Sequence, residues 1–153
     1  MSKTSKQRGS GCPICYALDV FGDRWTLLIL RDLLLHGKER YRDFLASDEA
    51  IASNILSDRL RRLEAGDIIF REYDPNDRRQ LIYRATDKGQ TLIPVLLEIA
   101  AWGASNDPST AAPPGFAEHF YAHREAYHDD HAGMMAKLGK SEDDTLLDVS
   151  DKD

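Results

Sequence analysis

Cysteine and long apolar runs are both scarce in this sequence. A membrane-spanning helix needs about 20 mostly apolar residues, but the longest apolar runs here, residues 27–30 and 33–35, are separated by Arg31 and Asp32. The basic stretch at residues 1–11 is not followed by an apolar segment, so we expect no secretory signal and a cytoplasmic protein. A phosphate-binding glycine loop, a dinucleotide fingerprint and a Ser-His-Asp arrangement are also lacking. These absences predict a protein that is not an enzyme, holds no cofactor and contacts no membrane.

The negative charge of the chain is concentrated in its C-terminal third. The formal net charge is −6, yet residues 1–104 carry 16 Lys/Arg and 15 Asp/Glu, whereas residues 105–153 carry 4 and 11. The first part is therefore near neutral, at +1, and the second has a charge of −7. Binding to nucleic acid requires a local basic surface rather than a basic chain. A nucleic-acid partner is thus not excluded, and we expect moderate, strongly salt-dependent affinity.

Three helices are predicted in the first third of the chain. Pro13 fits the first turn of a helix that Gly22 ends. Asp23 is a good N-cap for a central helix over residues 24–36, and a short helix follows at residues 41–46. The apolar residues expected to face the core from the first and third helices are Ile14, Leu18, Phe21, Tyr41, Phe44 and Leu45.

The segment around which the rest is organised is residues 53–66, SNILSDRLRRLEAG. Its apolar residues recur at helical spacing on one face, namely Ala52, Leu56, Leu60 and Leu63. The opposite face carries Asn54, Ser57, Asp58 and Arg61. Short hydrogen-bonding side chains and arginine behind an apolar stripe suit a helix that packs on a core and lies against a polar partner.

After Gly66 the spacing becomes that of strands. Residues 68–73 and 79–85 predict a hairpin whose loop is residues 74–78, with Pro75 where a type I turn favours it. A helix followed by a hairpin with a basic tip is the outline of a winged helix-turn-helix, a mainly helical α+β fold that binds duplex DNA.

The remaining chain is predicted to be helical apart from one linker. Thr86 is an N-cap for a helix to residue 102, which Pro94 should bend, and its apolar stripe is Leu92, Val95, Leu96, Ile99 and Trp102. A C-terminal helix carries Phe116, Phe120, Tyr127 and Met134 on one side. The predicted organisation is a disordered basic arm (1–11), the winged helix-turn-helix domain (12–104), a linker (105–114), the C-terminal helix (115–139) and a disordered acidic tail (140–153).

Candidate DNA contacts lie on the central segment, at the hairpin tip and beside the short helix. The residues predicted to touch bases or phosphates are Ser53, Asn54, Ser57, Asp58, Arg61, Arg62, Arg78, Arg79, Arg40 and Arg42. Asp58 would repel phosphate unless it meets a cytosine amino group or pairs with Arg61 or Arg62. Arg59 lies nearer the core side and is expected to pair with an acid such as Glu64 or Asp67. The alternatives are a solvated helix face and an ordinary charged turn.

These segments, in this order, resemble the HxlR-type helix-turn-helix domain, a relative of the MarR-like regulators. The resemblance spans residues 12–104. It is carried by Cys12-Pro13-Ile14, Leu18-Asp19-Val20, Gly22, Trp25-Thr26, residues 28–33, residues 40–44, Ile51, Leu56-Ser57, residues 59–61, Leu63-Glu64, Tyr83, Thr86, Gly89, Pro94 and Trp102. The chain departs from the family pattern at Ala52, where a serine is usual, and at Gly66-Asp67, which reverses the usual order. Asp67 is then expected to adopt the left-handed backbone conformation.

The resemblance implies a dimeric bacterial transcription regulator with dimerisation helices at both ends of the domain, and it implies that Cys12 responds to oxidants or electrophiles. A thiol at a helix N-terminus is stabilised as thiolate, and Cys12 and Cys15 have the spacing of redox pairs. The alternative is that both are ordinary reduced residues. A structural zinc would require a second such pair.

Four histidines cluster near the C-terminus, His119, His123, His128 and His131. The first two have a metal-capable spacing, but the H-E-x-x-H order is absent, so we expect a solvated polar face and no metal site; the alternative is metal or pH sensing. The leading hypothesis is a dimeric repressor that binds a pseudo-palindromic operator; the alternative is a winged-helix module that binds proteins without reading DNA.

Overall fold

The structure, a computed structural model, describes residues 10–143 and the side chains of residues 10–139. The chain divides after Gln90 into two compact units, and each is described by itself. Residues 1–9 of the predicted basic arm and residues 144–153 of the predicted acidic tail lie outside the described residues. In the described part of the chain, none of the helices has the length and apolar content of a membrane span.

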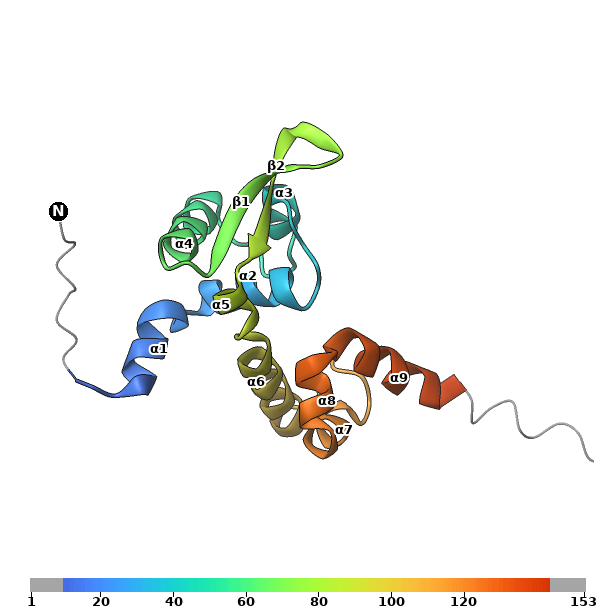
Figure 1. Ribbon diagram of the computed structural model, residues 1–153. Coiled ribbons are helices and arrows are strands. Elements are labelled where there is room, and N and C mark those ends of the chain that lie inside the picture. Colours follow the sequence, from blue (N-terminus) through green and yellow to red (C-terminus); the bar gives the residue numbers. More distant parts are fainter. Residues whose placement is uncertain (1–9, 144–153) are drawn as a thin grey trace, which may run out of the picture. The chain divides into compact units, whose positions relative to one another are not determined.

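The first unit has the predicted winged helix-turn-helix order (Figure 1). Its elements are α1 (Pro13–Phe21), α2 (Arg24–Leu34), α3 (Tyr41–Leu45), α4 (Ser53–Ala65), β1 (Ile69–Asp74), β2 (Asp77–Ala85) and α5 (Asp87–Gln90). The hairpin of β1 and β2 lies beside α4 and extends past the helices at its tip (Figure 1). The fold class predicted from the sequence is therefore confirmed.

Local sequence signals fix where these elements begin and end. Pro13 occupies the first turn of α1 behind the N-cap Cys12. The carboxylate of Asp23 caps α2 by accepting the backbone N–H of Thr26, at 3.2 Å, and the Thr26 hydroxyl. Asp67 has a φ of 58°, so the left-handed conformation expected there is confirmed. These residues set the start of α1, the start of α2 and the turn that follows α4.

The core of the first unit forms where α2 packs against α4 and α4 packs against β1. Leu56, Leu60 and Leu63 of the predicted apolar stripe are buried, whereas Ala52 is exposed at the N-cap position just before α4. Other buried apolar residues of this unit are Ile29, Leu30, Leu34, Phe44, Ile51, Ile68, Ile69 and Ile82. One face of α4 is thus fixed to the core, and the opposite face is presented to solvent.

The hairpin turn is tighter than predicted. β2 begins at Asp77, so only Pro75 and Asn76 lie between the strands. The Asn76 N–H donates to Oδ1 of Asp74 at 2.8 Å, a side-chain mimic of a turn that the sequence pattern did not reveal. Arg78 and Arg79 consequently belong to the first residues of β2, at the tip of the β1–β2 hairpin, which is the wing of this fold.

The prediction that Ile14, Leu18 and Phe21 of α1 face the core is wrong within a single chain. No residue of α1 is buried. Ile14 and Leu18 have exposed fractions of 67% and 55%, because nothing in the described chain covers this side of the helix. An amphipathic helix whose apolar side is not covered by its own chain leaves that side exposed to solvent.

The second unit contains α6 (Ile93–Asn106), α7 (Phe116–Ala122), α8 (Arg124–Asp129) and α9 (His131–Asp143). Two predictions fail here. The helix predicted from Thr86 to residue 102 is broken into α5 and α6, and Pro94 lies in the first turn of α6, where its missing N–H does no harm. The single C-terminal helix is three helices, interrupted at His123 and Asp130, and the last continues to Asp143, into the predicted tail.

The core of the second unit is largely aromatic. The C-terminal apolar residues Phe116, Phe120, Tyr127 and Met134 are buried as predicted. On α6, however, the buried residues are Leu96, Leu97 and Ala101, whereas Ile99 and Trp102 are 48% and 67% exposed. The predicted stripe was wrong at these two positions because α7 packs on a different side of α6.

Candidate nucleic-acid interface

The solvent face of α4 carries the side chains predicted to read DNA. Ser53, Asn54, Arg61 and Arg62 are exposed, and Ser57 is half-buried. No side chain caps the N-terminus of α4 at Ala52, so its first N–H groups are available to an anionic partner. The face therefore combines hydrogen-bonding groups with cationic side chains.

Asp58, the acid on this face, is neutralised within the chain. Nε of Arg62 lies 3.0 Å from its carboxylate, and Arg59 also bonds to it. Of the two partners considered for Asp58 in the sequence, Arg62 is the one present. Arg59 pairs with an acid, as predicted, but its partner is Asp23 at 2.9 Å rather than Glu64 or Asp67. This hydrogen bond raises the pKa of the guanidinium.

Of the arginines predicted to contact DNA, Arg61 and Arg78 have no acid partner among the residues that the structure describes. Both are exposed, and neither forms an ion pair with any residue in the described part of the chain. Arg79 beside them is 91% exposed but lies 3.1 Å from Asp77. Exposed arginines on α4, the recognition helix of this fold, and at the tip of the wing are suited to phosphates and guanine.

Arg40 and Arg42, predicted together, have different surroundings. The Arg40 guanidinium bonds to the buried carboxylate of Asp74 and to Gln80, and so joins α3 to both strands of the wing. Arg42 is exposed, with Asp43 as its nearest acid at 4.0 Å. Arg40 therefore holds the wing in place through its own contacts, and its assignment as a phosphate ligand remains a prediction.

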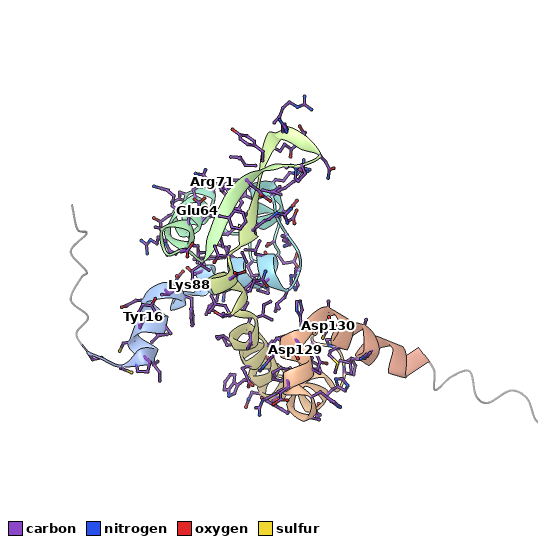
Figure 2. The ribbon with its side chains drawn as sticks, viewed as in Figure 1. Tyr16, Glu64, Arg71, Lys88, Asp129 and Asp130 are labelled. Carbon is purple, nitrogen blue, oxygen red and sulfur yellow. The ribbon has the colours of Figure 1, made fainter. Side chains whose placement is uncertain are left out.

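Two further contacts orient α4. The Tyr41 hydroxyl of α3, expected to face the core, instead lies 3.0 Å from the Ser53 carbonyl and 2.9 Å from Oγ of Ser57. At the other end, Arg71 of β1 and Glu64 of α4 lie side by side, with Nε and Oε1 2.7 Å apart (Figure 2). Sequence reasoning missed both contacts because each partner is in another element.

A buried carboxylate, Asp32 of α2, organises the turn before α4. It is 2% exposed and accepts hydrogen bonds from Ser47, from Arg31 at 2.8 Å and from Lys38 at 3.1 Å. Burial alone would raise the pKa of Asp32, but these three donors hold it below its usual value. Arg31 also bonds to Glu49, and this lowers the pKa of Glu49 to about 2.

The two cysteines are exposed free thiols at the start of α1. Backbone N–H groups of Cys15 and Ile14 point at the Cys12 sulfur and lower the pKa of its thiol. This is the effect expected of a helix N-terminus on a thiolate. These contacts favour the thiolate form of Cys12.

The histidines of the second unit make contacts with one another and with Tyr127. The His119 and His123 rings lie 4.5 Å apart, and Nδ1 of His119 is 2.7 Å from the Tyr127 hydroxyl. Within residues that the structure describes, no three or more His, Cys, Asp or Glu side chains are grouped as a metal site would require.

Comparison with known proteins agrees with this geometry. The HxlR-like helix-turn-helix family matches residues 20–110. YybR, an uncharacterised HTH-type transcriptional regulator of Bacillus subtilis, is 34% identical over 96 residues, which cover 63% of this chain and 76% of YybR. The oxidised redox regulator HypR is 33% identical with a TM-score of 0.56, over 63% of this chain and 98% of HypR. The reduced B. subtilis regulator YodB is 30% identical with a TM-score of 0.53, over 66% and 100%. The chain belongs to the HxlR-like helix-turn-helix family of transcriptional regulators.

Proposed function

We propose that this regulator is a homodimeric repressor that binds a pseudo-palindromic operator and responds to oxidants or electrophiles through Cys12. The observation that carries the DNA-binding part is the pair Arg61 and Arg78. Both are exposed, both lack an acid partner within the described residues, and they stand on the recognition helix and the wing tip of a winged helix-turn-helix. In such a fold α4 enters the major groove and the wing follows the backbone.

The proposed contacts divide by chemistry. Ser53, Asn54 and Ser57 supply neutral donors and acceptors for base edges, and Arg61 is suited to guanine. Arg42, Arg62, Arg78 and Arg79 supply positive charge for phosphates. Asp58 orients Arg62 and Arg59 rather than facing the DNA as a free anion.

The homodimer is supported by apolar side chains that lack a core. Ile14 and Leu18 on α1 and Ile99 and Trp102 on α6 are between 48% and 67% exposed. Exposed apolar faces of this kind typically mark association surfaces, and a two-fold symmetric dimer is the commonest solution. Such symmetry places the two α4 helices in half-sites about one helical turn, or a multiple, apart.

The effector response is supported by the lowered pKa of Cys12 and by the likeness to HypR, which is a redox regulator. An electrophile would form a covalent bond to the Cys12 sulfur. A two-electron oxidant such as a hydroperoxide would be reduced while Cys12 and Cys15 lose their thiol protons and join in a disulfide. Either reaction changes the start of α1, where the proposed dimer contact lies.

The proposal is tested by selecting duplexes from a random-sequence pool and titrating the enriched duplex by fluorescence anisotropy. We expect a pseudo-palindromic motif, two protomers per duplex by sedimentation, and affinity that falls steeply with salt. Absence of enrichment, or salt-independent binding, would contradict the proposal and favour a winged-helix module that binds proteins instead.

A further inference from the structure

The contact between Tyr41 and the first turns of α4 constrains the hydroxyl protons. Tyr41 lies 3.0 Å from the carbonyl oxygen of Ser53 and 2.9 Å from Oγ of Ser57. A carbonyl oxygen can only accept a hydrogen bond, so the tyrosine hydroxyl donates its single proton to Ser53. Its oxygen is then an acceptor toward Ser57, and the Ser57 hydroxyl donates to it. This is the one arrangement in which both contacts are hydrogen bonds.

This pair of hydrogen bonds determines whether Ser57 can donate or accept a hydrogen bond with a partner. A free serine hydroxyl both donates and accepts, but here its only proton is directed to Tyr41. The lone pairs that remain make Ser57 an acceptor. Ser57 lies on the same face of α4 as Asn54 and Arg61, one turn from each, and both of these are exposed.

Acceptors and donors are distributed differently among the bases of the major groove. Adenine and cytosine present amino donors there, whereas guanine presents O6 and N7 and thymine presents O4, all acceptors. An acceptor-only side chain can bond to the first two bases and not to the last two. Hydroxyl side chains ordinarily bond to base donors and base acceptors alike. The hydrogen bond to Tyr41 therefore makes Ser57 selective for bases that present a donor.

We propose that Tyr41, by taking the hydroxyl proton of Ser57, makes each protomer select adenine or cytosine at the base that Ser57 faces. The inference rests on the proposed function, because it requires α4 to lie in the major groove. Tyr41 is a positioning residue in this account: it acts on the DNA through Ser57 and need not touch a base.

The test compares motifs selected from a random-sequence duplex pool by the wild-type protein, Ser57→Ala and Tyr41→Phe. The Ser57→Ala motif identifies the position that depends on Ser57. At that position the wild type should prefer adenine or cytosine on the contacted strand by about fivefold, the worth of one hydrogen bond. Tyr41→Phe should reduce this preference to near unity and leave other positions unchanged. Tyr121→Phe, which removes a tyrosine hydroxyl from α7, should retain the full wild-type motif.

The outcomes separate the inference from the function on which it rests. A wild-type protein that enriches no motif overturns both. A clear motif in which Ser57→Ala alters no position, or in which the altered position prefers guanine or thymine, overturns the inference alone. A preference that survives in Tyr41→Phe refutes the role of Tyr41, since the freed serine proton would then have turned to the Ser53 carbonyl. If Tyr41→Phe proves unstable, a wild-type preference for guanine or thymine at the position that depends on Ser57 still overturns the inference.

Discussion

At the scale of single residues, the arginines near the proposed DNA-binding surface differ in their partners. Arg40 and Arg59 bond to Asp74 and Asp23, acids from other elements, and so position the wing and α4. Arg61 has no such acid among the described residues. An arginine paired with an acid of another element contributes to geometry, whereas an unpaired one keeps its guanidinium free for guanine or phosphate. The division between the two roles lies in these tertiary contacts.

The Arg31–Glu49 pair and the donors around Asp32 should make the fold sensitive to acid. Both carboxyls have folded pKa values below their unfolded values. Their contribution to the free energy of unfolding is therefore complete above the unfolded pKa and is lost as pH falls through the folded one. For Glu49 this window runs from pH 4.5 down to about 2.

Urea unfolding at a series of pH values measures the effect. Glu49→Gln should have a lower free energy of unfolding than the wild type near neutrality and should lose less of it across the window. Glu118→Gln should follow the wild type, and an unchanged slope in Glu49→Gln would contradict the role of the pair.

The lowered pKa of Cys12 predicts reactivity at neutral pH. In Cys15→Ser, which keeps Cys12 alone, the rate of alkylation by iodoacetamide should rise with pH to a midpoint below 9.0, the usual thiol value. N-acetylcysteine serves as the reference thiol. A midpoint at or above that of the reference would rule out stabilisation by the start of α1.

In DNA-binding assays, Cys12→Ser should keep its affinity after treatment with a hydroperoxide that releases the wild type from DNA.

Among single residues, the sequence predicted which types face outward on α4 but not their partners. Asn54 and Arg61 are exposed as their helical spacing indicated. Tyr41 and Asp32 were missed because an aromatic in an apolar pattern and an acid in a leucine-rich helix carry no local sign of a distant partner. Both roles arise from elements that meet only in the folded chain.

At the scale of elements, the first turn of α5 is packed directly on the residue before β1. The Ile68 carbonyl accepts the N–H of Thr86 at 3.0 Å, and the Thr86 hydroxyl in turn accepts the Gly89 N–H at 3.0 Å. A Cβ at Gly89 would lie 2.1 Å from the Ile68 oxygen. The close approach that closes the base of the wing is therefore possible only for glycine.

Gly89→Ala should consequently destabilise the first unit by about 2 kcal/mol, because overpacking against backbone cannot relax by side-chain rotation. Gly66→Ala is the matched control in the same unit: its Cβ would meet no atom closer than 3.4 Å, and we expect a change within about 0.5 kcal/mol. Urea unfolding followed by circular dichroism measures both. Equal midpoints for the two variants would show that α5 shifts freely away from the strand.

The elements were predictable where their ends carry local signals. Asp23, Pro13 and the change of period after Gly66 gave α1, α2, α4 and the hairpin within a few residues. The helices of the second unit were not, because the breaks before Pro94 and at His123 separate segments that share one apolar pattern. Periodicity reports an apolar face and continues across a break that tertiary packing imposes.

At the scale of the whole molecule, negative charge is concentrated in the C-terminal part of the chain. The near-neutral part, residues 1–104, holds Arg61 and Arg78, and the acidic part, residues 105–153, carries a charge of −7. Acidic residues outside the interface disfavour non-specific contact with phosphates. Affinity for DNA should then depend on few cations, and each should be visible in the salt dependence of binding.

The salt dependence of binding to a selected duplex tests the central claim, that α4 and the wing of this chain hold DNA. Anisotropy titrations at several salt concentrations would compare the wild type with Arg61→Ala, Arg78→Ala and the control Arg124→Ala, whose arginine pairs with Glu98 on α6. The account predicts weaker binding for the first two and no change for the control. The slope of log affinity against log salt should be smaller by about one for each phosphate that a variant no longer neutralises. Wild-type affinity in both Arg61→Ala and Arg78→Ala, together with an unchanged slope in Arg78→Ala, would contradict the account.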